Sequence, residues 1–159
     1  MVLKFIYTLF IGFLFATLVG VGISAFYESP KPPIYPTALS VPCKENIDNE
    51  EFNDLTIKQG KFDNEQKTFQ EKEQIYNRNI SIIAIIASIL TLLISLTLFK
   101  KILVIADGLL LGGVLTILYG IIRGFGSGND KFRFIIVLIG FIVSLILGYI
   151  KFIKPQTKK

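Results

Sequence analysis

The sequence has no histidine and no tryptophan, and it has a single cysteine, Cys43. Without histidine, the chain lacks the commonest general base of enzymes and the commonest imidazole ligand of metal ions. One cysteine cannot form a disulfide within the chain, so cysteine pairing gives no indication of the cellular compartment. No catalytic, metal-binding or nucleotide-binding motif is recognisable in the sequence. We therefore expect a protein that is not an enzyme and that has no metal or cofactor.

Charged residues are also scarce, because Asp, Glu, Lys and Arg together make up 18% of the 159 residues, whereas hydrophobic residues make up 52%. The mean hydropathy of +0.59 is high for a soluble protein of this size. The net charge is +5, but the lysines lie mostly beside apolar blocks. In that position they indicate membrane topology and contacts with lipid headgroups, so we expect no nucleic-acid partner.

The apolar residues form four blocks, and each is long enough to cross a bilayer, since about 20 apolar residues in a helix span the hydrocarbon core. The first block is longer than the apolar region of roughly 7–15 residues found in signal peptides, so we expect it to be retained as a span. The sequence predicts an all-α integral membrane protein with a four-transmembrane-helix bundle. The predicted spans are residues 1–27, the second half of 62–99, 102–122 and 134–153.

The connections between the spans differ in character. Five of the six prolines lie between Pro30 and Pro42, where their fixed φ and missing donor favour an extended conformation. Asp63 and Gln66 fit a helical capping box, and neither glycine nor proline interrupts residues 61–99. The predicted extramembrane segments are a Pro-rich and polar loop (28–61), a stalk helix that continues into the second span (62–99), a Gly-rich hairpin (123–133) and a basic tail (154–159).

Three aromatic residues of the predicted stalk, Phe62, Phe69 and Tyr76, recur every seven residues on an otherwise polar surface. Residues 28–79 contain too few apolar side chains to form a core of their own. We therefore expect this region to pack against the bundle or to bind a membrane or envelope protein partner.

Small residues recur at regular spacing in each span, and in a bilayer such residues allow helices to approach closely and to form hydrogen bonds. In the first, third and fourth spans the interval is four residues: Thr8, Gly12, Ala16, Gly20 and Ser24; then Gly108, Gly112, Thr116, Gly120 and Gly124; then Gly140, Ser144 and Gly148. In the second span the intervals alternate between three and four: Ser81, Ala84, Ser88, Thr91 and Ser95. We interpret these positions as helix-packing faces of the bundle, with an interface between copies of the chain as the alternative for one of them.

Asp107 is the one carboxylate within a predicted span. An acid inside a membrane is energetically costly, which makes Asp107 a candidate site for a proton or a cation. It lies about 8 Å along the third helix, near one end, at ~1.5 Å per residue. A structural role is therefore the favoured interpretation, with an ion pair to Lys100 or Lys101 or a hydrogen bond from a serine of the second span.

Two function classes remain open on these grounds. The favoured hypothesis is a non-enzymatic scaffold, accessory or partner-binding subunit of an envelope complex, which engages its partner through residues 28–79. The alternative is a small oligomeric transporter or channel that uses Asp107.

The distribution of lysines also predicts an orientation. Short segments on one side carry Lys4, Lys100, Lys101 and the lysines of the tail, a density of positive charge typical of the cytoplasmic side. Both termini are therefore predicted to be cytoplasmic and residues 28–79 extracytoplasmic. A composition rich in Ile, Lys, Phe and Asn and poor in Ala and Arg indicates an AT-rich bacterial genome and hence a bacterial plasma membrane.

Overall fold

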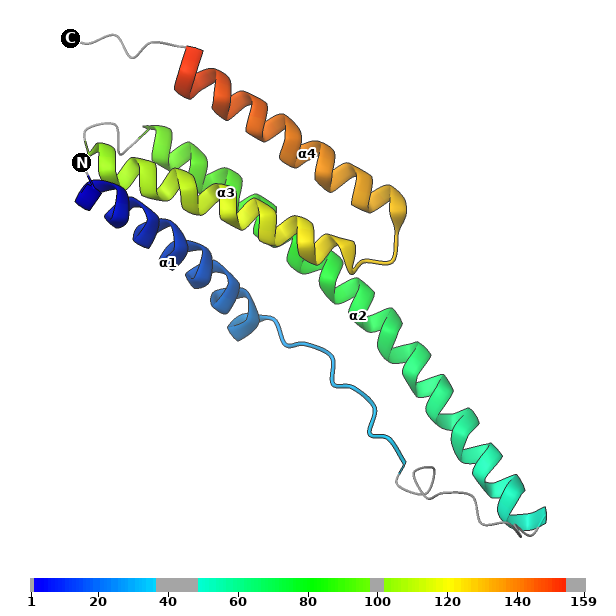
Figure 1. The fold of residues 1–159 in the computed structure, drawn as a ribbon. Coiled ribbons are helices and arrows are strands. Elements are labelled where there is room, and N and C mark those ends of the chain that lie inside the picture. Colours follow the sequence, from blue (N-terminus) through cyan, green and yellow to red (C-terminus); the bar gives the residue numbers. More distant parts are fainter. Residues whose placement is uncertain (1, 37–48, 98–101, 154–159) are drawn as a thin grey trace.

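The computed structural model describes residues 2–36, 49–97 and 102–153, and these residues form four α-helices. They are α1 (Val2–Phe26), α2 (Asn49–Thr97), α3 (Leu103–Phe125) and α4 (Asp130–Gly148), and α4 continues into a π-helical turn, η2 (Tyr149–Ile153). Figure 1 shows α1, α3 and α4 alongside one half of α2, whose other half extends past them as a stalk. All four helices are long and apolar enough to cross a membrane, which confirms the predicted fold class.

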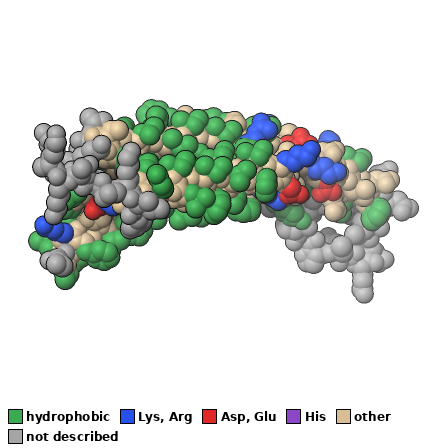
Figure 2. Space-filling view, turned by 90° about the horizontal axis from the view of Figure 1, so that it is seen from above, with side chains coloured by type: hydrophobic (Ala, Val, Ile, Leu, Met, Phe, Trp, Pro, Cys, Tyr) green, Lys and Arg blue, Asp and Glu red, His purple; other side chains and the backbone are tan. Residues whose placement is uncertain are grey.

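The surface of the bundle is apolar in the way that a bilayer requires. Figure 2 shows a band of hydrophobic side chains across the middle of the visible face, with charged side chains on either side of it, most of them toward the stalk. The hydrophobic side chains of α1 and α4 are largely exposed, for example Phe10, Leu18 and Phe141 at 60%, 67% and 60%. A helix with an apolar exterior can be stable when lipid rather than water surrounds it.

Helix α3 is central, because it packs against α1, α2 and α4. Its glycines explain how it can do so. Residues four apart are displaced by about 40° around a helix of 3.6 residues per turn, so the line from Gly108 to Gly124 winds around α3. At its start, Gly108 and Gly112 lie against α1. Further along, Gly120 lies against α2, and Gly124 lies between Ile136 of α4 and Ser81 of α2. One row of small residues thus packs against different helices along its length.

Helix α2 begins at Asn49, earlier than the predicted stalk helix at residue 62, and the loop predicted for residues 28–61 is correspondingly shorter. Gly60 lies within the helix, although glycine in a helix costs about 1 kcal/mol relative to alanine. Local pairs such as Lys58 Nζ to Asp54 Oδ2 at 2.6 Å support this first part of α2. Residues 28–36 are extended, as their prolines predict, and Cys43 lies outside the described residues.

The turn between α3 and α4 is narrower than the hairpin predicted for residues 123–133, because α3 ends at Phe125 and α4 begins at Asp130. Asn129 caps α4, with its Oδ1 accepting hydrogen bonds from the backbone N–H groups of Lys131 and Phe132 at 3.0 and 3.2 Å. Gly128 has a φ of +68°, and a Cβ there would lie 2.4 Å from Gln74 of α2. The positive φ favours glycine at this turn, and the missing side chain leaves room for the end of the Gln74 side chain.

The fourth predicted span, residues 134–153, corresponds to α4 together with η2. The helix thus starts four residues earlier than predicted, at its Asn129 cap, and changes to a π-helical turn over its last residues.

Candidate functional site

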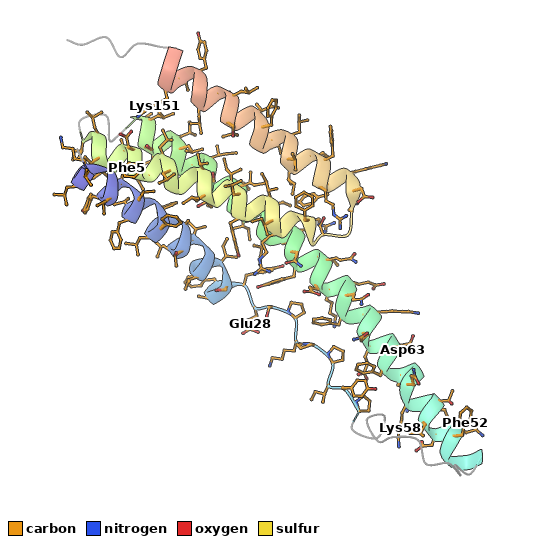
Figure 3. The ribbon with its side chains drawn as sticks, viewed as in Figure 1. Phe5, Glu28, Phe52, Lys58, Asp63 and Lys151 are labelled. Carbon is orange, nitrogen blue, oxygen red and sulfur yellow. The ribbon has the colours of Figure 1, made fainter. Side chains whose placement is uncertain are left out.

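Asp107 forms an ion pair with Lys151, which was not among the partners expected from the sequence. Its carboxylate Oδ1 accepts a hydrogen bond from Lys151 Nζ of η2, and the two side chains are 43% and 41% exposed. Figure 3 shows Lys151 at the same end of the bundle as Phe5, where α1 begins. Lys100 and Lys101 lie outside the described residues, so that part of the expectation is not addressed.

A hydrogen bond to Asp107 from a serine of the second span was expected, but Ser95, which lies beside Asp107, bonds to the preceding residue. Ser95 Oγ of α2 donates to the carbonyl oxygen of Ala106 at 2.7 Å. Ser95, Asp107 and Lys151 line a cavity of about 40 Å³, roughly the space of one water molecule. The ion pair between Asp107 and Lys151 lies beside this cavity and connects α3 to the turn that follows α4. Among the side chains that the structure describes, no three His, Cys, Asp or Glu residues are grouped as metal ligands.

The serine row of α2 faces α3 along the whole interface, and Ser81, Ser88 and Ser95 are 0%, 0% and 2% exposed. Ser88 Oγ donates to the carbonyl oxygen of Gly113 at 2.8 Å. Ser81 Oγ has no hydrogen-bond partner among the described residues. The three serines therefore contribute differently: two link the helices by hydrogen bonds, and one mainly supplies a small side chain.

The predicted glycine positions differ in how closely neighbouring helices approach them. A Cβ at Gly12, Gly112 or Gly140 would lie 2.8, 3.0 or 2.9 Å from Leu111, Phe15 or Ile121, respectively. At Gly20 the nearest atom would be 4.0 Å away, and at Gly148 no atom lies within 4 Å. Ala16 is half-buried on the same helix as Gly12. The α1 row is thus close-packed at Gly12 and open toward its end at Gly20.

The seven-residue aromatic repeat of α2 holds Tyr27 and the extended segment 28–36 against the stalk. Tyr27 stacks on Tyr76 with ring centroids 5.2 Å apart, and Tyr35 meets Phe62 edge-on at 5.1 Å. Phe69, between them, lines an open groove with Pro30 and Pro33. The Pro-rich segment thus packs against the stalk helix, which belongs to the same region 28–79, so this contact is neither packing on the bundle nor binding of a partner.

Other apolar side chains of the stalk and of the extended segment stay exposed. Phe52 and Ile57 of α2 are 61% and 58% exposed, and Ile34 is 90% exposed. Figure 3 shows Phe52 near the far end of the stalk, well beyond Glu28, which follows α1. These side chains lie beyond the apolar spans, where lipid tails do not cover them.

A polar cluster at the base of the stalk was not foreseen from the sequence. Arg123, in the last turn of α3, donates from NH1 to Asn77 Oδ1 at 3.1 Å and from Nε to the hydroxyl of Tyr119 at 3.3 Å. Asn77 is only 8% exposed. The position of Arg123 four residues after Tyr119 was the available signal, but the contact with Asn77 depends on tertiary packing.

Comparisons with protein-family models, curated proteins and solved structures find no match for this chain.

Proposed function

We propose that this protein is a non-enzymatic membrane protein that binds a partner protein through its stalk, as a scaffold or accessory subunit of an envelope complex. The observation that carries the proposal is the stalk itself. It projects past the other three helices (Figure 1), and a single extended segment packs along it.

The exposed apolar side chains of the stalk region support this proposal. Exposed apolar surface costs about 25 cal/mol per Å² relative to burial, so a partner that covers Phe52, Ile57 and Ile34 would gain affinity. Aromatic and large aliphatic side chains are also those that dominate binding energy at protein interfaces.

Site-specific photo-crosslinking tests the partner directly. A photoreactive amino acid is placed at position 52 or 57, and at position 141 of the α4 surface as the control. We expect positions 52 and 57 to cross-link the same partner protein, and position 141 not to. The partner should then co-purify in mild detergent with wild-type protein but not with an Ile57→Asp variant, whereas Gln59→Ser on the exposed stalk surface should leave it bound. Cross-links from positions 52 and 57 only to lipid or to further copies of this chain would overturn the proposal.

The orientation that we propose places both termini in the cytoplasm and the stalk outside, in a bacterial plasma membrane. Two lysines support this orientation. Lys151 lies at the end of the bundle opposite the stalk, as does Phe5, which follows Lys4 in α1 (Figure 3). Positive residues near span ends favour the cytoplasmic side. The bacterial assignment rests on the residue composition.

The transport alternative has less support. A proton or cation site at Asp107 would need an available carboxylate, and this one pairs with Lys151 near the end of the bundle.

A further inference from the structure

A groove of about 360 Å³ lies at the base of the stalk, where three helices and the extended segment meet. Ser24 near the end of α1 and Pro30 of the extended segment form one wall. Phe69, Glu73 and Tyr76 of α2 form the other wall, and Arg123 of α3 and Ser29 of the extended segment also line the groove.

The groove contains two opposite charges that do not pair with each other. Arg123 uses two of its five N–H donors on Asn77 and Tyr119, and its guanidinium carbon lies 5.7 Å from the centroid of the Tyr119 ring. Neither Arg123 nor Glu73 takes part in the ion pairs found among the described residues. The buried Asn77 holds the guanidinium in place, so the remaining donors are available to an anion.

The groove lies at the level along the bundle where the headgroups of a bilayer would be. Helix α1 ends at Phe26 and α3 ends at Phe125, which places the groove at the ends of two apolar spans. Tyr27, Tyr76 and Tyr119 gather at this level, as in the aromatic belts that mark the interface between membrane and water.

We propose that this groove binds the zwitterionic headgroup of an aminoethyl phospholipid. The phosphate accepts hydrogen bonds from Arg123, whose guanidinium can bind phosphate through two parallel N–H donors. The primary ammonium donates to the carboxylate of Glu73 and lies beside the half-buried ring of Phe69. The acyl chains then extend along the apolar surface of the bundle. This site does not depend on partner binding by the stalk.

Lipid binding to the purified full-length protein tests the assignment by native mass spectrometry. The probes are phosphatidylethanolamine and phosphatidylglycerol with identical acyl chains, because only the first has an ammonium group. We expect wild-type protein to retain phosphatidylethanolamine about tenfold more strongly, as one additional hydrogen bond between charged groups would give.

Two variants separate the roles of the charges. Glu73→Gln should reduce phosphatidylethanolamine binding to the level of phosphatidylglycerol, and Arg123→Gln should reduce binding of both lipids. Glu71→Gln, on the exposed stalk surface outside the groove, is the matched control and should keep the wild-type preference. Glu73 is exposed, so its variant stays informative if Arg123→Gln fails to fold.

Equal retention of the two lipids by wild-type protein, or an unchanged preference in Glu73→Gln, would overturn the proposal. Competition by soluble phosphorylethanolamine tests whether the acyl chains are needed, because this compound has the headgroup without them. We expect it to compete only at concentrations at least a hundredfold above those of the lipid, since each buried CH₂ group of an acyl chain contributes about 0.8 kcal/mol. Competition at equal concentrations would assign the groove to a soluble ligand and not to a lipid.

Discussion

Ser81 and Ser88 are both fully buried in α2, but only Ser88 donates a hydrogen bond to α3. We expect Ser88→Ala to lower the free energy of unfolding by about 1 kcal/mol, because the bond to the Gly113 carbonyl is lost. Ser81→Ala should leave it unchanged or raise it slightly, because the substitution removes a buried hydroxyl without a partner. Reversible unfolding in mixed detergent micelles measures both values. A larger loss for Ser81→Ala than for Ser88→Ala would contradict this assignment.

At Asp107, the pairing with Lys151 predicts a modest structural role. Both side chains are more than a third exposed, and ion pairs of this kind contribute about 1 kcal/mol or less. We expect Asp107→Asn and Lys151→Met each to lower the free energy of unfolding by no more than this amount. The double variant should cost less than the sum of the two, because both changes remove the same interaction.

The same Asp107→Asn variant separates the structural role from transport. In sealed vesicles that contain purified protein, we expect no proton or cation flux above that of empty vesicles, for wild type and variant alike. A flux that is present with wild-type protein and absent with Asp107→Asn would support the transport alternative instead.

Between helices, the close approach of α1 and α3 depends on Gly112, and Gly22 provides a matched comparison. A Cβ at Gly112 would lie 3.0 Å from Phe15 and 3.2 Å from the backbone oxygen of Gly12, whereas at Gly22 no atom lies within 4 Å. We expect Gly112→Ala to lower the free energy of unfolding by about 1–3 kcal/mol through overpacking. Gly22→Ala should leave it unchanged or raise it by up to about 1 kcal/mol, because alanine favours the helix. Equal effects of the two substitutions in detergent unfolding would show that α1 and α3 do not pack closely at Gly112.

The helices were easier to predict from the sequence than the contacts between them. The four spans follow from hydropathy and length, because a bilayer sets both. The sequence does not predict which helix packs against each small residue, because the spacing of small residues defines only a face of their own helix. Gly120 illustrates this, since the four-residue row that begins against α1 has turned toward α2 at that position.

The polar contacts could be predicted less well than the spans. The sequence indicated Asp107 as an unusual carboxylate, but Lys151 lies 44 residues away, and only the packing of α4 on α3 brings the two together. Arg123 and Asn77, 46 residues apart, meet for the same reason. A start of α2 at Asn49 was missed because Gly60 usually weakens a helix, and its cost is small enough for neighbouring residues to offset.

For the whole molecule, four spans place the start of α1 and the end of η2 at one end of the bundle, opposite the stalk (Figure 1). Which end faces the cytoplasm decides on which side of the membrane the proposed partner would meet the stalk, and which leaflet would supply the proposed lipid to the groove at Arg123. The short lysine-rich segments predict that the termini are cytoplasmic.

Cys43, the single cysteine, reports this orientation directly. In intact cells, we expect a membrane-impermeant maleimide to label Cys43, because residues 28–79 are then outside. The control is a Cys43→Ser, Thr157→Cys double variant, whose only thiol lies in the basic tail and should react only after the membrane is permeabilised. The reverse pattern would invert the topology. The stalk would then meet a cytoplasmic partner, and the groove at Arg123 would lie in the inner leaflet.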